Sequence, residues 1–182
     1  KTLKSKWIIK NNVLSFEIEN INKSEAFIID PVVRTWGTYY GGSGDDYGIS
    51  CATDASGNVY MAGITLYVST GTSIATSGSH QSAYGGGNRD AFLVKFNSAG
   101  IRQWGTYYGG SGDDCGSSCA TDASGNVYMA GYTTTTSNIG SIIATSGSHQ
   151  SAFGGVFCNA FLVKFNSAGI RLWGTYYGNN GN

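Results

Sequence analysis

Two pairs of adjacent aspartates are the first residues of this sequence whose type and spacing could do chemistry. Asp45 and Asp46 end the word GGSGDD, and Asp113 and Asp114 end a second, identical copy of it. Paired carboxylates in a glycine-rich loop could hold Ca²⁺, which takes about six to eight oxygen ligands. The loop lacks the alternating aspartates of known calcium loops, so the alternative is that one aspartate of each pair caps its turn. We predict no metal and no cofactor, and keep the four carboxylates as candidate binding residues.

Two histidines occupy equivalent places in two copies of the word SGSHQSA. His80 and His149 each stand alone in their part of the chain, whereas a metal or catalytic site needs further ligands, a nucleophile or a carboxylate nearby. We expect a structural or surface role and keep both as candidate binding residues. No catalytic residue is predicted, because the repeated part of the chain contains no Glu and its Asp residues recur at turn positions.

The chain has four cysteines: Cys51, Cys115, Cys119 and Cys158. Cys115 and Cys119 lie four positions apart in an expected strand, which separates them by about 13 Å. That distance is too long for a disulfide bond, and zinc sites place their cysteine pairs closer together on turns. We therefore predict small buried side chains, and the redox state of the cysteines is left open.

Aromatic side chains recur in the word WGTYY, which begins at Trp36, Trp104 and Trp173. Such rings could stack on sugars or pack between neighbouring structural elements. The tyrosines concerned are Tyr39, Tyr40, Tyr107 and Tyr108. Because the word falls in the same strand of every repeat, packing between repeats is the expected role.

An internal repeat positions all of these residues. Residues 36–103 and 104–172 are two near-identical copies, and residues 173–182 begin a third. The first copy predicts four strands, at about 48–53, 59–65, 91–96 and 101–108. The words DASGN and NSAG supply tight turns, because Asp and Asn favour turns and Gly adopts a positive φ. No segment has a helical period, so we expect almost no helix.

A four-stranded antiparallel unit that repeats at a fixed period predicts the blades of a β-propeller. The predicted fold class is all-β, with four-stranded blades in an incomplete ring: two full blades and the start of a third. Propellers close with about four to eight blades, so two blades cannot close a ring alone. We expect a fragment of a longer protein; the alternative is that several copies assemble into one ring.

The words TYYGGSGDD, ATDASGNVYMAG and SAYGGGNRDAFLVKFNSAG, with their second copies, carry a family resemblance. They resemble the SBBP family, a bacterial seven-bladed β-propeller repeat, over residues 35–182. The resemblance implies a secreted or surface-attached bacterial protein and implies no catalytic activity. Residues 1–34, which end near Pro31, resemble the tail of the β-rich domain that often precedes such repeats. Short strands are expected there at 7–10, 13–18 and 26–30.

Composition narrows the choice of partners. Charged residues make up 12% of the chain and the formal net charge is zero, whereas an average soluble domain has roughly 25%. Nucleic acid is excluded as a partner, because phosphate binding requires a basic patch. No apolar run reaches the ~18 residues that a membrane-spanning helix needs.

Strand direction places the GGSGDD loops and the long segments 66–90 and 134–159 at one end of the blades, where ligand binding is expected. We predict a non-catalytic structural or binding module at the cell surface, with the remaining blades and a protein or carbohydrate ligand as partners. A role in adhesion would fit. The alternative is the scaffold of a propeller hydrolase or lyase whose active-site residues lie in other blades.

Overall fold

The computed structural model describes residues 5–10, 13–18, 35–66, 73–136, 142–155 and 157–178. The chain divides into two compact units, Lys1–Arg34 and Thr35–Asn182, and each is described by itself. Every regular element in the described residues is a strand, which confirms the all-β prediction. Accordingly, these residues contain no helix of a length and hydrophobicity suited to crossing a membrane.

The first unit contains one antiparallel hairpin. Strand β1 (Ser5–Lys10) pairs with β2 (Val13–Ile18) over their full lengths. Lys6 lies opposite Glu17, and their side chains form an ion pair of 2.9 Å. Both side chains are more than half exposed, so the pair contributes little to stability. The strand expected at 26–30 lies outside the described residues, and a relation of this unit to an upstream domain stays a prediction.

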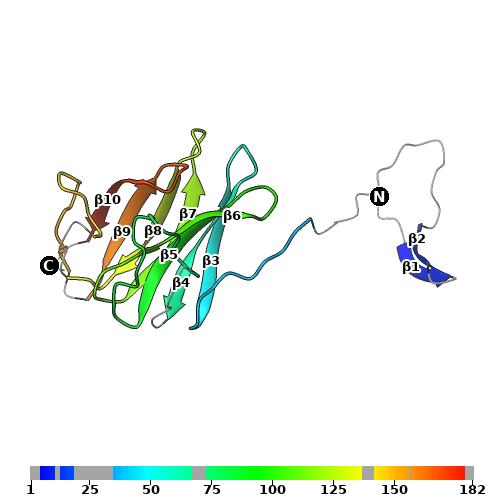
Figure 1. The fold of residues 1–182 in the computed structure, drawn as a ribbon, viewed down its shortest axis with the longest axis horizontal. Helices are drawn as coiled ribbons and strands as arrows, with labels where there is room; N and C mark the ends of the chain where they lie inside the picture. Colours follow the sequence, from blue (N-terminus) through cyan, green and yellow to red (C-terminus); the bar gives the residue numbers. More distant parts are fainter. Residues whose placement is uncertain are drawn as a thin grey trace. The chain divides into compact units, whose positions relative to one another are not determined.

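The second unit consists of two four-stranded antiparallel sheets, which we call blade 1 and blade 2 (Figure 1). Blade 1 contains β3 (Asp46–Thr53), β4 (Val59–Leu66), β5 (Arg89–Phe96) and β6 (Arg102–Tyr108), in that order across the sheet. Blade 2 contains β7 (Asp114–Thr121), β8 (Val127–Thr133), β9 (Asn159–Phe165) and β10 (Arg171–Tyr177). The prediction of partial propeller blades in an unclosed ring is confirmed.

The repeat in the sequence and the blade in the structure are offset. The repeat begins at Trp36, whereas the first strand of blade 1 begins at Asp46. Residues 173–177, the start of the third copy, therefore belong to β10, the fourth strand of blade 2. They do not open a third blade, because their strand pairs with β9 along the edge of the second sheet.

Tight turns join the first strand to the second and the third to the fourth in each blade. In blade 1 the Asp54 carboxylate accepts backbone N–H groups of Ser56 and Asn58, at 2.9 and 3.0 Å. Gly57 follows with a φ of 75°, a conformation that favours glycine. The second turn repeats the arrangement around the Asn97 side chain. These contacts confirm the role predicted for DASGN and NSAG.

The two blades pack face to face, with β3, β4 and β5 all contacting β7 (Figure 1). One hydrophobic cluster spans this interface and includes the buried side chains of Tyr60, Leu93 and Trp104 from blade 1 and of Met129 and Phe165 from blade 2. A second cluster covers the opposite face of blade 1. Strand β5 is therefore buried on both faces, as its apolar residues on both sides predict.

The long insertion between β4 and β5 returns along the outer edge of its own blade. The backbone N–H of Thr76 donates to the carbonyl of Gly105 at 2.9 Å, and the N–H of Tyr107 donates to the carbonyl of Gln81 at 3.1 Å. Strand β6 would otherwise present an open edge, and the insertion covers it. Blade 2 repeats this pairing along β10. The described part of each insertion is thus largely bound to its blade and does not form a free displayed loop.

Candidate functional site

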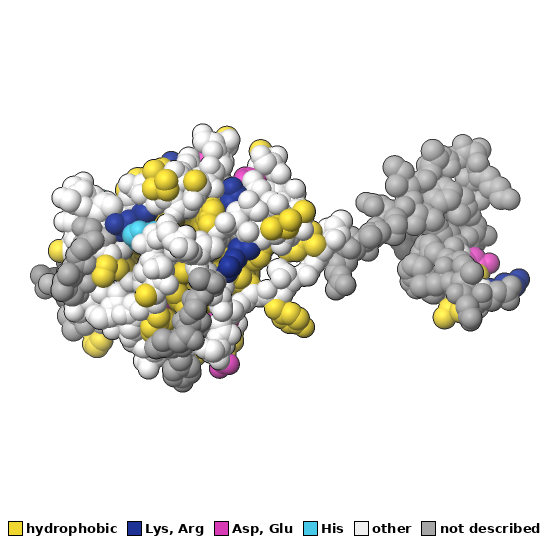
Figure 2. Space-filling view, in the orientation of Figure 1, with side chains coloured by type: hydrophobic (Ala, Val, Ile, Leu, Met, Phe, Trp, Pro, Cys, Tyr) yellow, Lys and Arg dark blue, Asp and Glu magenta, His cyan; other side chains and the backbone are white. Residues whose placement is uncertain are grey.

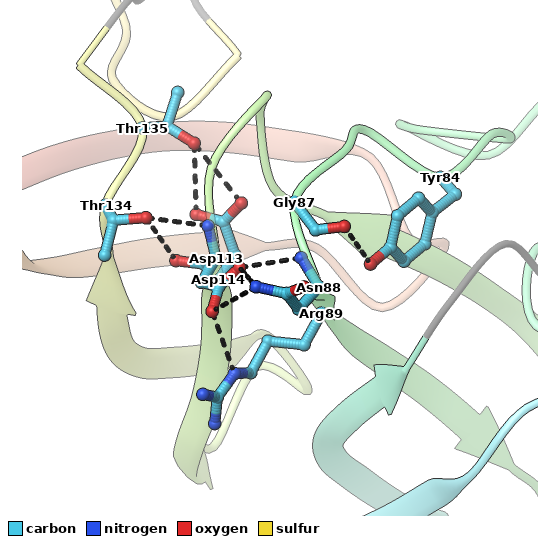
Figure 3. A network of polar contacts seen from close by, with 8 residues as sticks. All are labelled: Tyr84, Gly87, Asn88, Arg89, Asp113, Asp114, Thr134 and Thr135. Carbon is cyan, nitrogen blue, oxygen red and sulfur yellow. Dashed lines mark hydrogen bonds and ion pairs between the residues drawn. The ribbon is translucent and has the colours of Figure 1, made fainter.

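The aspartate pair of blade 2 lies where three loops meet, in a group of residues that we call the loop junction (Figure 3). The junction consists of the end of the first insertion and the first residue of β5 (Tyr84, Gly87, Asn88 and Arg89), the end of the loop between the blades and the first residue of β7 (Asp113 and Asp114), and Thr134 and Thr135 after β8. It joins blade 1 to blade 2 through polar contacts alone, at the end of the blades where the sequence predicts binding.

Asp113 connects all three loops. Its carboxylate accepts the backbone N–H of Asn88 at 2.7 Å and pairs with Arg89 Nε at 3.4 Å. Its own backbone N–H donates to Thr134 Oγ1 at 2.7 Å. Tyr84 adds a hydrogen bond from its hydroxyl to the carbonyl of Gly87. The sequence-predicted candidate Asp113 therefore holds neighbouring loops in place (Figure 3).

Asp114 and its counterpart Asp46 cap the loops that precede them. The carboxylate of Asp114 accepts the backbone N–H of Gly110 at 2.8 Å, and that of Asp46 accepts the N–H of Gly42 at 2.7 Å. An added Cβ at Gly109 would lie 2.6 Å from the Asp114 carboxylate, so the loop requires glycine there. This is the turn-capping role that the sequence offered as the alternative to a ligand site.

Burial changes the acidity of Asp114. Desolvation raises its pKa to about 6, although hydrogen bonds from Thr133, Gly110 and Thr135 act in the opposite direction. The nearby charge of Asp113 raises it further. A fully buried carboxyl group with several donors fits a structural cap better than an exposed ligand-binding group.

The aspartate pair of blade 1 lies beside a solvent-exposed pocket. Residues 39–42 and 44–47 line a shallow pocket of about 420 Å³. Tyr39 is fully exposed and Tyr47 is about half exposed beside it. Asp45 is exposed, whereas its counterpart Asp113 is engaged by Asn88 and the rest of the loop junction. In blade 2 the equivalent position is occupied by the end of the blade 1 insertion, which contains Asn88. The pocket beside Asp45 is therefore the place that the insertion of a preceding blade would occupy.

Asp90 is a buried carboxyl group that sequence reasoning missed. It is fully buried at the start of β5, and one oxygen accepts the backbone N–H of Gly85 at 2.5 Å. The other oxygen has no hydrogen-bond partner among the described residues. Desolvation raises the pKa of Asp90 to about 8, against the backbone N–H groups of Gly85 and Gly86, and the charges of Asp114 and Asp113 add to the increase.

Two carboxyl groups with separated pKa values are also a feature of acid–base catalysis, and Asp90 and Asp114 differ in this way. Both are fully buried, which leaves no room for a substrate. In blade 2 the position of Asp90 is taken by Asn159, whose side-chain oxygen accepts the N–H groups of Gly154 and Gly155. An amide fulfils the same role there, so Asp90 acts as a neutral, loop-binding group.

His80 lies apart from the aspartates, in a cleft between the blades. The cleft has a volume of about 440 Å³ and is lined by residues 76–80, 103–104 and 168–171. The imidazole packs on Tyr108 and Phe165, with ring centroids 5.8 and 5.7 Å away. Desolvation, together with the charge of Arg171, lowers the pKa of His80 to about 4, so the ring is neutral at pH 7. Its counterpart His149 is exposed and stacks on Tyr177.

The structure thus brings the aspartates of each pair together but separates them from the histidines. Within the described residues, no hydrogen bond or ion pair connects His80 to Asp113 or Asp114. Those residues also contain no group of three or more His, Cys, Asp or Glu placed to hold a metal ion. Whether any of the six candidates contacts a ligand stays a prediction.

The cysteines differ from the prediction. Only Cys115 is buried; Cys119 is intermediate, and Cys51 and Cys158 are exposed. Cys119 donates weakly to Ser50 on the neighbouring blade, whereas the equivalent side of Cys51 faces no described blade. The prediction of four small buried side chains was wrong because it treated strands with open faces as fully covered.

The ion pair of the loop junction leads to a prediction of small effect. We expect the coupling free energy between Arg89 and Asp113, measured by a double-mutant cycle of Arg89→Ala and Asp113→Ala, to be below about 1 kcal/mol. The reason is that the Arg89 side chain remains 39% exposed, so solvent screens the pair. The measurement is urea unfolding at low and high salt. A coupling above about 2 kcal/mol that is insensitive to salt would contradict this description.

Comparison with known proteins agrees with the blade geometry. Residues 103–139 match the SBBP family, a beta-propeller repeat. The match covers β7, β8 and most of β6, and it confirms the resemblance seen in the repeated words.

Over 148 residues the chain is 29% identical to an uncharacterized WD repeat-containing protein, L264, of Acanthamoeba polyphaga mimivirus. The aligned stretch covers 75% of this chain and 10% of that relative. Together with the SBBP match, this similarity supports a propeller-type structural or binding module.

One signal in the repeated sequence could have revealed the loop junction. The copies differ at few positions, and several of these surround the junction: Tyr84, Asn88, Arg89 and Asp90 become Phe153, Phe157, Cys158 and Asn159. Residues that change together between near-identical copies are candidates for mutual contact.

Proposed function

We propose that this chain is a non-catalytic structural and binding module of a secreted or cell-surface bacterial propeller protein. A protein or glycan ligand binds the surface formed by the loops between β4 and β5, between β8 and β9, and between consecutive blades; the described parts of the two long loops are held on their blades by backbone hydrogen bonds. The location rests on the resemblance to the SBBP family. The enzyme-scaffold alternative has no separate observation in its favour, since the buried carboxyl groups serve the loops.

The observation that carries this proposal is the loop junction. Asn88, Asp113 and Thr134 belong to three different loops and are tied together by short hydrogen bonds. A preorganised loop surface loses less conformational entropy on binding than a mobile one. In blade 2 the most variable stretch of the repeat, residues 132–143, includes Thr134 and Thr135 of the loop junction; the corresponding stretch of blade 1 is residues 64–74.

The surface chemistry suits a neutral partner. Charged residues make up only 12% of the chain, and in the view of Figure 2 Lys, Arg, Asp and Glu side chains are few among hydrophobic and other groups. Hydroxyl and amide groups at Asn88, Ser111 and Thr136 are exposed around the loop junction. Such groups form direct hydrogen bonds with sugars or with a polypeptide backbone, and affinity from them is largely independent of salt.

The test is a loop exchange. In the variant, residues 135–141 replace residues 67–72. The variant and the unaltered chain are each tested for binding on a glycan array and by crosslinking to proteins on intact bacterial and host cells. We expect the exchange to change what is bound while far-ultraviolet circular dichroism stays the same. The matched control is Ser56→Ala, an exposed position in a tight turn at the opposite end, which should bind as the unaltered chain does. No capture on either probe would contradict a binding role.

A further inference from the structure

The cleft that contains His80 has walls from both blades. Residues 76–80, the word TSGSH, come from the insertion of blade 1, and residues 168–171, from the word SAGIR, come from the tight turn before β10 and its first residue. Residues 103–104 of β6 complete the lining. Because the turn between β9 and β10 forms one wall, the cleft lies at the opposite end of the blades from the loop junction.

The words that form the two walls occur unchanged in both copies of the repeat. TSGSH recurs at 145–149, and SAGIR recurs at 98–102. In blade 2, residues 145–149 again form one wall of a hollow at the equivalent place. Close packing between blades favours apolar side chains, whereas these words supply Ser, Thr, His and Arg. Several of these polar groups take no part in holding the blades together.

Arg171 brings an unbalanced positive charge to the cleft. Its Nη1 donates to the carbonyl of Ile142 at 2.7 Å, which fixes the side chain. No Asp or Glu is among the described residues that line the cleft, and Arg171 forms no ion pair within the described ranges. Its charge contributes to the lowered pKa of His80, so it acts inside the cleft. A guanidinium has further N–H donors in a planar fork, which suits a carboxylate.

Uncharged groups with free hydrogen-bonding capacity accompany Arg171. The Ser77 side chain is exposed, and its hydroxyl has no partner within the described part of the chain. The Gln103 amide donates to a backbone carbonyl at 3.0 Å, and its oxygen remains available. The neutral imidazole of His80 has one nitrogen that can accept a hydrogen bond. Ile170, which is 61% exposed, adds an apolar patch. A fitting ligand therefore combines a negative charge, hydroxyl groups and an apolar face.

The size of the cleft restricts the ligand to a small molecule or a single residue of a polymer. Its volume of about 440 Å³ lies within the range of about 300–1,000 Å³ that is usual for ligand pockets. A pyranose ring presents hydroxyls at its edge and C–H groups on its faces, and a uronic acid adds a carboxylate. A neutral sugar lacks the partner for Arg171, and a simple carboxylate such as acetate leaves Ser77 and Gln103 unused.

We propose that the cleft between blades 1 and 2 binds a uronic acid residue of an acidic glycan. Arg171 binds the carboxylate. Ser77, Gln103 and His80 form hydrogen bonds with ring hydroxyls, and Ile170 packs against a face of the ring. Because the words TSGSH and SAGIR recur, every interface with the same sequence offers these contacts, and weak sites add up on a polymeric ligand. The site is separate from the loop junction, so either binding activity can be lost without the other.

The first test is isothermal titration calorimetry of the chain with methyl β-glucuronide, beside methyl β-glucoside and acetate. We expect the glucuronide to bind at least about tenfold more tightly than either of the others, and Arg171→Gln to remove this preference. Arg102→Gln is the matched control, because Arg102 Nη1 makes the equivalent hydrogen bond to the carbonyl of Ser73, at 2.7 Å, but does not line this cleft. Equal binding of the three probes, no binding of the glucuronide, or an unchanged preference in a folded Arg171→Gln variant would overturn the proposal.

The second test uses a substitution that the repeat already contains. Leu172 occupies in blade 2 the position of Gln103, so Gln103→Leu is expected to fold. It should weaken glucuronide binding by about threefold to tenfold, the net value of a hydrogen bond, while acetate binding stays the same. An affinity for the glucuronide that equals that of the unaltered chain would contradict the assignment of hydroxyl contacts to this wall of the cleft.

The third test follows the His80 ring by nuclear magnetic resonance. The titratable groups that face this imidazole are Tyr108 in β6 and Arg171 in β10. A bound carboxylate opposes the effect of the Arg171 charge, so the glucuronide should raise the pKa of His80 above its value of about 4. The neutral glucoside should leave it unchanged. A pKa of His80 that does not move at saturating glucuronide would place the ligand elsewhere and contradict the proposal.

Discussion

Trp104→Ala is expected to lower the free energy of unfolding by about 3–5 kcal/mol, the range found for large buried aromatic side chains. Trp104 is 8% exposed and packs near Tyr60 and Phe165, with ring centroids 6.2 and 6.3 Å away. Its indole also donates to the carbonyl of Ser167. The substitution removes the largest side chain that crosses from β6 to blade 2 and leaves a cavity between the blades.

The chain contains a matched control for this experiment. Trp173 stands in the same word, on the same strand of the next blade, but packs only against its own blade near Tyr128. Trp173→Ala should cost less than about 2 kcal/mol. Guanidinium unfolding followed by circular dichroism measures both values. Equal losses would show that Trp104 gains nothing from the neighbouring blade, in contradiction to the structure.

Asp90→Asn is expected to stabilise the protein at pH 8 by about 1–3 kcal/mol, the usual cost of a buried group that lacks its partners. Asp90 has a pKa of about 8 in the folded chain, against 3.8 for an ordinary aspartate. Between these values the unfolded chain has released the proton that the folded chain keeps, so stability falls as the pH rises. The amide of Asn cannot ionise and removes this loss.

The measurement is chemical unfolding of both proteins at several values between pH 4 and pH 8. Comparing the two at each pH isolates Asp90 from Asp114, which also titrates in this range. The reciprocal variant Asn159→Asp provides the control: it places a carboxyl group at the equivalent buried position of blade 2 and should introduce the same pH dependence there. Parallel pH profiles for the unaltered chain and Asp90→Asn would contradict a buried neutral carboxyl group.

Local signals in the sequence predicted the blades well. The four strands of blade 1 begin and end within two residues of their predicted bounds. Turn motifs such as DASGN were predictable because local contacts fix their conformation: the Asp54 side chain binds backbone N–H groups of the turn, and Gly57 adopts a positive φ. The choice of inter-blade packing over sugar stacking was right for Trp104, whose indole in β6 donates to the carbonyl of Ser167 in blade 2.

The parts that were not predicted depend on contacts between distant segments. The pairing of Thr76 with Gly105 along β6 joins residues with no shared local pattern. The ion pair of Arg89 and Asp113 crosses from one blade to the next. In the sequence, Asp90 has the pattern of an exposed polar residue at the start of a strand. It is buried because the insertion before β5 folds over it. Single-sequence patterns do not contain these distances.

Oxidative footprinting of the three WGTYY words tests the central structural claim most directly, because one sequence is compared with itself in one sample. The chain is exposed to hydroxyl radicals and digested, and oxidation at each tyrosine is measured by mass spectrometry. We predict rapid oxidation of Tyr177 and strong protection of Tyr108, whose exposures are 70% and 0%. Equal oxidation of the two would contradict the packing of blade 1 on blade 2, and with it the contacts of the loop junction between the blades.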